Sequence, residues 1–117
     1  MINMAKDICE IKSLREDVIE EVYKEMLDNE AYENTANLFK LLGDYNRLRI
    51  INALKINELC VCELSILLDM SQSSISHQLR ILRDHNIVKS RKENKKVFYS
   101  LNNSNIFKLI QKGIELE

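Results

Sequence analysis

The sequence has 117 residues, of which 45% are apolar and 30% charged, and a net charge of −1, which together indicate one small globular domain. Pro is absent and Gly occurs only twice, so the composition favours helices and excludes long linkers. No apolar run approaches the roughly 20 residues of a membrane span, and the N-terminus lacks the apolar block of a secretory signal, so we expect a cytoplasmic protein without a membrane partner.

Three helices are predicted in the first half of the chain. Apolar residues recur at helical spacing over Glu16–Asn29 and again over Ala31–Leu42. Gly43 stands just after the second of these helices, where a helix end often has glycine. Asp44 is a residue type that caps helices, and it predicts a third helix that runs to Lys55.

A helix-turn-helix is predicted next. One short helix is expected over Leu59–Asp69, and Ser71 is expected to cap another over Gln72–Asp84. A tight turn at residues 69–71 joins them, and this arrangement is typical of DNA-binding proteins.

A β-hairpin is predicted after the helix-turn-helix. Residues 87–92 and 97–101 are rich in β-branched and aromatic side chains, and the polar residues 93–96 between them form a basic tip. A helix-turn-helix followed by such a hairpin is a winged helix. The predicted fold is therefore mainly α with a β-hairpin.

The closing segment, residues 105–116, has the apolar stripe of one more amphipathic helix. Together with the N-terminal helix it offers more apolar surface than a small domain can cover alone, which favours a homodimer whose interface is built from the N- and C-terminal helices. In this interpretation residues 1–15 are a flexible arm, and residues 16–117 form the DNA-binding and dimerisation domain.

The charges are distributed unevenly along the chain. Residues 1–35 have ten Asp or Glu against four Lys or Arg, whereas residues 71–96 have seven Lys or Arg against two acidic residues. A basic patch on a helix and hairpin is typical of proteins that bind the phosphates of DNA. A solvated charged face would show the same composition.

The three cysteines predict thiol chemistry. Their number is odd, and Cys60 and Cys62 are too close in sequence for an unstrained disulfide, which favours free thiols in a reducing compartment. On an ideal helix these two side chains point to rather different sides, so they bind one ion only at an irregular first turn or at the helix edge. Free Cys is also common as a small buried hydrophobic residue.

Thiolates select soft or borderline ions, such as Cd²⁺, Pb²⁺, Zn²⁺ or trivalent arsenic. Three sulfurs suit Pb²⁺ or As³⁺ directly, whereas tetrahedral Cd²⁺ or Zn²⁺ requires a fourth ligand. Glu63, Glu10, Asp7 or water offers an oxygen for that position. The candidate metal ligands are Cys9, Cys60 and Cys62, with Glu63 as a further candidate.

Four segments resemble successive landmarks of the ArsR/SmtB family of metal-sensing repressors. They are LGDYNRLRI at 42–50, ELCVCEL at 58–64, SQSSISHQLR at 71–80 and VFYSL at 97–101. The resemblance covers roughly residues 30–110, and Tyr45 replaces the usual proline at a helix start. It implies a dimeric winged-helix repressor that binds operator DNA when free of metal and releases it on binding metal.

The resemblance also separates the branches of this family. The arsenic-responsive branch has a third cysteine on the same helix, where this chain has Ser65, so an arsenite or antimonite response is the less favoured alternative. The cadmium- and lead-responsive branch has an N-terminal Cys-Glu-Ile stretch, which Cys9-Glu10-Ile11 matches. Ser13 replaces the second cysteine of that extension, so one of the usual four thiolates is missing.

Another metal site of the family lies between the C-terminal helices of two subunits and uses Asp and His. This chain has Asn103, Asn105 and Leu116 at the corresponding positions, which predicts that this site is absent. A winged-helix regulator whose cysteines sense thiol oxidation remains an alternative to a metal sensor.

The predicted recognition helix has Ile75, Leu79 and Leu82 on its core face. Its outward polar residues are candidates for contacts with DNA bases in the major groove. They are Gln72, Ser73, Ser76, His77 and Arg80. The basic residues of the wing are candidates for phosphate contacts, which give affinity more than sequence choice. They are Arg91, Lys92, Lys95 and Lys96.

Neither histidine predicts catalysis. His77 belongs to the recognition helix, and His85 stands at its end, where it can interact with the last carbonyl groups. The sequence supplies no set of nucleophile, base and orienting residue and no phosphate-binding glycine loop, so we do not expect an enzyme.

Overall fold

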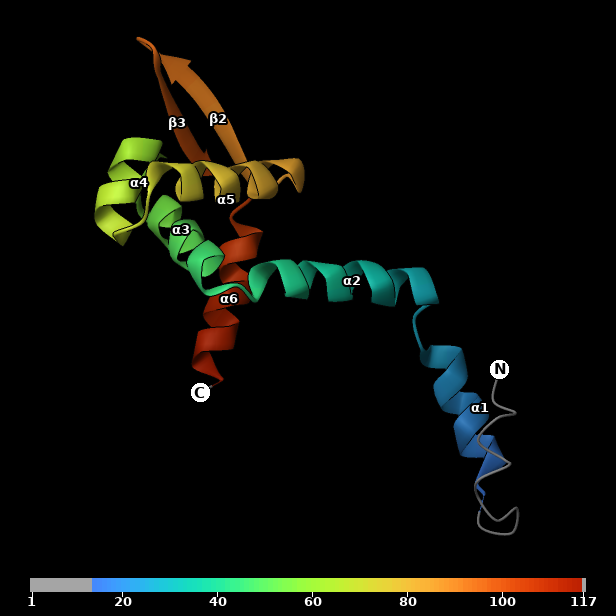
Figure 1. Ribbon diagram of the computed structural model, residues 1–117. Coiled ribbons are helices and arrows are strands. Elements are labelled where there is room, and N and C mark those ends of the chain that lie inside the picture. Colours follow the sequence, from blue (N-terminus) through green and yellow to red (C-terminus); the bar gives the residue numbers. More distant parts are fainter. Residues whose placement is uncertain (1–13, 117) are drawn as a thin grey trace. The chain divides into compact units, whose positions relative to one another are not determined.

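The structure is a computed structural model that describes residues 14–116 (Figure 1). The helices in those residues are α1 (Glu16–Glu25), α2 (Asn29–Leu42), α3 (Tyr45–Ile56), α4 (Val61–Leu68), α5 (Gln72–Asp84) and α6 (Asn105–Glu115). The strands are β1 (Leu59–Cys60), β2 (Val88–Glu93) and β3 (Lys96–Leu101). The chain divides into two compact units between Asn37 and Leu38, within α2.

The first unit contains α1 and the first part of α2. The sequence pattern predicted that the first helix would run to Asn29, but α1 ends at Glu25 because Met26 is extended, with φ −70° and ψ 151°. The carboxylate of Asp28 accepts the backbone N–H of Ala31 at 2.8 Å, as a capping side chain does at a helix start. The chain therefore breaks between two helices at a point that the apolar pattern did not reveal.

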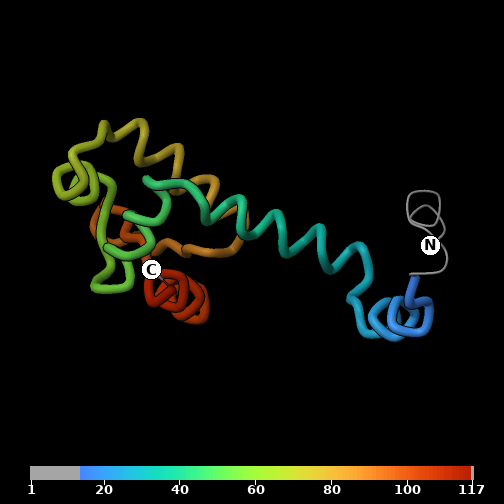
Figure 2. Tube along the Cα trace, turned by 90° about the horizontal axis from the view of Figure 1, so that it is seen from below, coloured from blue at the N-terminus to red at the C-terminus, as the bar shows by residue number. Residues whose placement is uncertain are grey.

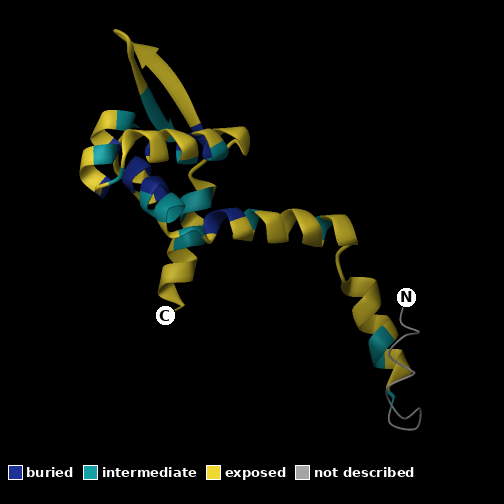
Figure 3. Ribbon diagram, viewed as in Figure 1, coloured by how far each residue is buried: buried dark blue, intermediate teal, exposed yellow. Residues whose placement is uncertain are grey.

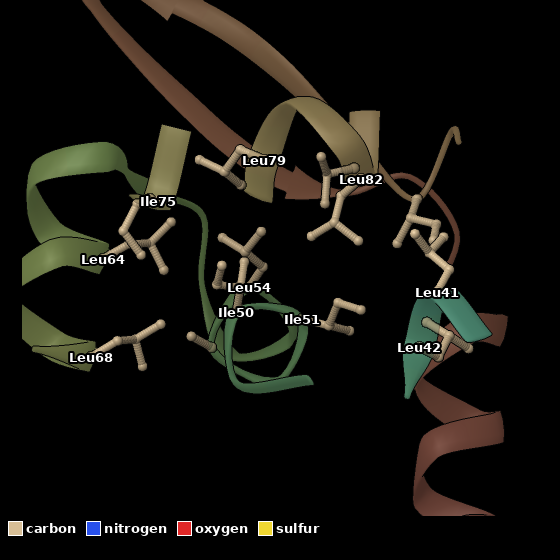
Figure 4. Packing of buried hydrophobic residues seen from close by; sticks show 13 residues of the cluster. Leu41, Leu42, Ile50, Ile51, Leu54, Leu64, Leu68, Ile75, Leu79 and Leu82 are labelled. Carbon is tan, nitrogen blue, oxygen red and sulfur yellow. The ribbon is translucent and has the colours of Figure 1, made fainter. Parts of the chain in front are cut away.

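The second unit is built around an apolar core to which α3, α4 and α5 contribute most of the side chains (Figure 4). Leucines and isoleucines from these three helices point toward one another, and several have no solvent-accessible surface at all. The completely buried ones are Ile50, Ile51, Leu64, Ile75 and Leu82. Burying one such side chain contributes about 1.5–3 kcal/mol, so this core fixes the two helices of the helix-turn-helix against α3.

Two predicted caps are confirmed. The carboxylate of Asp44 accepts the N–H of Arg47 at 3.0 Å at the start of α3. The hydroxyl of Ser71 accepts the N–H of Ser74 at 3.1 Å at the start of α5. Each bond satisfies a backbone donor that the helix itself leaves without a partner.

The sheet has three antiparallel strands in the order β1-β3-β2, where the sequence predicted a two-stranded hairpin. Leu59 pairs with Tyr99 and Cys60 pairs with Phe98, so Leu59 and Cys60 form strand β1. Helix α4 therefore begins at Val61 rather than at the predicted Leu59. The pairing with β3 is a tertiary interaction, and it overrides the helical pattern of the local sequence. The hairpin of β2 and β3 itself is confirmed.

The wing turns through only two residues. Asn94 and Lys95 both have positive φ, 47° and 72°, and they connect Glu93 to its partner Lys96. Two residues with positive φ are the pattern of a type I′ turn, whose twist matches that of the flanking strands. The tip of the wing and the outward side of α5 are exposed, whereas the inner part of β3 is half-buried and the inward side of α5 is buried (Figure 3).

The last helix, α6, lies beside the other helices of the second unit (Figure 2). Its residues Ile106, Leu109 and Ile110 pack against the core. The winged helix is thereby complete, and its mainly helical architecture agrees with the predicted fold class. Within residues 14–116, no helix combines the length and the apolar character needed to cross a membrane.

Candidate functional site

The recognition helix α5 exposes the residues that the sequence singled out. Ile75, Leu79 and Leu82 are at most 1% exposed and face the core, which confirms their predicted orientation. All five candidate base contacts are solvent-exposed. They are Gln72, Ser73, Ser76, His77 and Arg80. Because the first of them lies at the N-terminal end of α5, this helix presents short polar side chains where a recognition helix meets base edges.

Two arginines of α3 hold the helix-turn-helix in place. Arg47 donates from Nε to the side-chain oxygen of Gln78 at 2.8 Å and from Nη1 to the carbonyl of Leu41 at 3.2 Å. Arg49 donates from Nη2 to the carbonyl of Leu68 at 2.7 Å, at the end of α4. Neither arginine was predicted to have a role from the sequence, and the structure shows both to be half-buried.

The wing divides its basic residues into two groups. Lys92, Lys95 and Lys96 are exposed, and none of the three forms a salt bridge with another residue of 14–116. Arg91 instead donates from Nε to Glu58 at 2.9 Å and from Nη1 to Glu93 at 2.7 Å. These carboxylates raise the pKa of Arg91, and the hydrogen bond from Arg91 lowers the pKa of Glu58.

Cys60 and Cys62 lie at the junction between β1 and α4. Cys60 is the N-cap of α4, has an extended backbone with φ −91° and ψ 170°, and is buried. Cys62 is in the first helical turn and is exposed. The pair therefore does not sit on an ideal helix, because one cysteine ends a strand and the other begins a helix. This first turn is irregular, which is one condition for chelation of an ion by both cysteines, although Cys60 is buried and Cys62 is exposed.

Glu63 supports the same turn. Its Oε1 accepts the backbone N–H of Cys60 at 2.9 Å, and hydrogen bonds from Cys60 lower its pKa, with a smaller contribution from the charge of Lys96. A carboxylate at this position is also favoured by the positive end of the helix dipole. Glu63 is therefore an anionic oxygen donor beside the buried thiol, although in the structure it is engaged in capping.

The donors in this turn fit a soft metal ion in kind. Two thiol sulfurs and one carboxylate are ligands that Cd²⁺, Pb²⁺ and Zn²⁺ accept. Among residues 14–116, however, no three His, Cys, Asp or Glu side chains are arranged as a ready metal site. The third candidate cysteine, Cys9, lies outside the described residues.

The end of α5 agrees with the interpretation of His85. Its Nδ1 lies 2.9 Å from the carbonyl oxygen of Ile81, in the last turn of the helix. This contact confirms that the imidazole interacts with a terminal carbonyl group, as predicted.

Comparisons with known proteins identify the family. Residues 44–90 match the family described as "Bacterial regulatory protein, arsR family". The chain is 36% identical to the cadmium resistance transcriptional regulatory protein CadC homolog of Staphylococcus aureus, over 94% of this chain and 91% of that protein. The chain belongs to the ArsR family. A second relative is the transcriptional repressor SmtB homolog of Synechocystis, which is 35% identical over 92% of this chain and 81% of that protein.

Solved structures support the same assignment. Reduced HlyU from Vibrio cholerae superposes with a TM-score of 0.65 and 37% identity, over 76% of this chain and 97% of that one. The ArsR-family match from residue 44 to residue 90 begins at the cap of α3 and includes Cys60 of β1, Cys62 of α4 and the whole of α5. The protein is therefore an ArsR-family transcriptional regulator with a winged helix-turn-helix, and it is not an enzyme.

Proposed function

We propose that this ArsR-family regulator is a metal-responsive repressor. In this proposal the metal-free homodimer binds operator DNA in the cytoplasm and releases it when a soft metal ion binds cysteine thiolates. The observation that carries the proposal is the position of Cys60 and Cys62 between a strand of the wing sheet and the first helix of the helix-turn-helix. A change at these two residues acts on β1, which pairs with the wing strand β3, and on α4, which packs against the recognition helix α5.

The proposed metal site consists of Cys60 and Cys62 together with Cys9 from the N-terminal arm, residues 1–15. Its thiolates favour Cd²⁺, Pb²⁺ or Zn²⁺, and Glu63 offers an oxygen to an ion that takes four ligands. The similarity to the CadC homolog over 94% of this chain supports cadmium or lead as the metal to test first.

The proposed DNA interface combines the exposed side of α5 with the wing. The polar residues of α5 would contact base edges and Arg80 would extend this surface, while Lys92, Lys95 and Lys96 would contact phosphates. Because Arg91 is bound to Glu58 and Glu93, it contributes less to phosphate binding than the three lysines in this proposal.

A homodimer is proposed from the apolar surface that each unit leaves uncovered. In the second unit, the end of α2 and α6 line an apolar groove, in which Phe39 and Ile114 are more than half exposed. In the first unit, Val22, Tyr23 and Met26 of the α1 region are also more than half exposed. Exposed apolar surface of this extent is typical of an interface between copies of a chain.

Titration of the purified protein with Cd²⁺ and Pb²⁺ tests the metal site. The absorption band of thiolate-to-metal charge transfer is expected to saturate at one ion per protomer, and Cys9→Ser, Cys60→Ser and Cys62→Ser are each expected to weaken the affinity. Lys92→Ala in the wing serves as a control with unchanged metal affinity. Loss of DNA binding on treatment with peroxide, without any metal band, would favour the thiol-sensing alternative.

A further inference from the structure

One row of residues crosses the whole sheet and joins the Cys60 position to the wing. Cys60 of β1 is opposite Phe98 of β3, and Phe98 is opposite Arg91 of β2. Residues opposite each other in antiparallel strands place their side chains on the same face. The guanidinium of Arg91 lies over the ring of Phe98, 4.9 Å from its centroid. A cysteine of the candidate metal site and a basic residue of the wing are therefore neighbours of the same aromatic ring.

Glu58 makes a second connection between these regions. It lies two residues before Cys60, and its carboxylate accepts hydrogen bonds from Nε of Arg91 at 2.9 Å and from Nη2 of the same guanidinium. The remaining Nη1 donates to Glu93 at 2.7 Å. Glu93 is on the same strand as Arg91, whereas Glu58 precedes β1. Of these two carboxylates, only Glu58 ties the wing to the segment that leads into Cys60.

The geometry of this contact favours a role in positioning. The side chains of Arg91 and Glu58 are 49% and 35% exposed, and exposed ion pairs contribute little to folding. The backbone ladder between β1 and β3 is only two residue pairs long. A planar, bidentate contact restricts direction more than a single bond does, so this pair limits how the hairpin can swing about its short attachment.

We propose that Glu58 is a positioning residue for the wing, and that through Arg91 it transmits the state of the Cys60 position to the wing's DNA contacts. The inference rests on the proposed metal response and names the link by which that response reaches the wing. Ligation at Cys60 would displace β1, and the displacement would pass through the pairing with Phe98 and through the ion pair to the hairpin.

Matched variants separate this role from a simple effect of charge. Glu58→Ala and Glu93→Ala each remove one carboxylate partner of Arg91, but only Glu58→Ala removes the ion pair that connects Arg91 to the segment before β1. The measurement is the affinity for a duplex selected from random DNA by the metal-free protein, with and without saturating Cd²⁺. Effectors commonly change affinity by roughly 5- to 150-fold, and we expect the effect of Cd²⁺ to fall to about two-fold or less in Glu58→Ala while Glu93→Ala retains the wild-type value.

Two measurements without metal complete the test. Amide hydrogen exchange is expected to rise in residues 88–101 of Glu58→Ala and to stay near the wild-type rate in Glu93→Ala. In Glu58→Ala, Arg91 would keep only Glu93 as a partner and become more available to phosphate, so the slope of log affinity against log salt is expected to steepen, by at most about 0.9. Thermal unfolding of both variants checks that the fold is retained.

The outcomes distinguish the inference from the proposed function. If Glu58→Ala binds Cd²⁺ normally and keeps the full effect of Cd²⁺ on DNA affinity, Glu58 does not transmit the signal and the inference is overturned. If wild-type DNA affinity does not respond to Cd²⁺ or Pb²⁺, the proposed metal response fails. In that case the exchange and salt measurements still decide whether Glu58 positions the wing, since unchanged values in Glu58→Ala would refute that role as well.

Discussion

Single side chains determine where the DNA-facing helix begins. Ser71 accepts the N–H of Ser74 at 3.1 Å, while Ser76, one turn later, is exposed on the outward side. Ser71→Ala removes the cap, and we expect a loss of about 0.5–2 kcal/mol in the free energy of unfolding. Ser76→Ala replaces an exposed helix residue with a better helix former, so the free energy of unfolding of this variant should not fall. Urea unfolding monitored by circular dichroism measures both.

The Ser76 side chain, unlike the Ser71 cap, is expected to act in DNA binding rather than in stability. Ser76→Ala removes a candidate contact to a base edge and is expected to weaken binding to the selected duplex without loss of stability. A stability loss in Ser76→Ala that equals the loss in Ser71→Ala would contradict the assignment of the cap.

Glu63 makes the start of α4 sensitive to acid. Its pKa is lowered from 4.5 in the folded protein because the carboxylate accepts hydrogen bonds from Cys60. A group with a lowered folded pKa stabilises the fold above its unfolded pKa, and this contribution is lost as the pH falls through the folded value. Glu63→Gln should therefore be less stable than the wild type at pH 7. The difference should shrink below pH 4.5 and disappear once Glu63 is protonated in both states.

Thermal unfolding of the two proteins between pH 7 and pH 3 measures this difference directly. Comparing them at each pH removes the contributions of other acidic groups, including Glu58. A difference that stays constant over the whole range would show that the ionised carboxylate is not what holds the turn.

At the scale of elements, substitutions in the wing turn distinguish the effect of backbone strain from the effect of charge. Lys95 adopts φ 72°, a region that costs a non-glycine residue of the order of 1 kcal/mol. Lys95→Gly relieves this strain and removes one charge, whereas Lys95→Ala removes the charge and keeps the strain. We expect both variants to lose DNA affinity equally, with a salt slope shallower by about 0.9, and we expect only Lys95→Gly to gain stability.

Arg80→Ala in the recognition helix provides the contrast. It should change which sequences are preferred, whereas both Lys95 variants should weaken binding to all duplexes similarly. Binding to a pool of randomised duplexes, measured for each variant, distinguishes these effects. Equal changes of sequence preference in Arg80→Ala and Lys95→Ala would contradict the division between α5 and the wing.

The elements differ in how far the sequence determines them. The caps at Asp44 and Ser71 and the apolar period of α5 act locally, so the pattern of residues sufficed to predict them. Strand β1 was missed because its two residues are extended only through their pairing with β3, about 40 positions later. The same is true of the Glu58–Arg91 contact, since two charged residues 33 positions apart do not reveal that they meet.

At the scale of the whole molecule, regulation requires coupling between two sites. Two of the candidate metal ligands, Cys60 and Cys62, lie where β1 meets α4, and α4 is followed by α5 after a turn of three residues. A metal ion that stabilises one arrangement of these elements must also bind more tightly to the protein when it already has that arrangement. In the proposed dimer this effect would be larger, because both recognition helices would have to match the spacing of successive major grooves.

The reciprocal measurement follows from this coupling. If metal weakens the affinity for operator DNA, the same DNA must weaken the affinity for metal by the same factor, typically about 1–3 kcal/mol of coupling free energy. We therefore expect Cd²⁺ or Pb²⁺ titrated into the protein–DNA complex to bind more weakly than to free protein, by the ratio found for DNA with and without metal. Identical metal affinities in the two titrations would mean that the cysteines bind an ion without regulating the protein, and the regulator would need a different effector site.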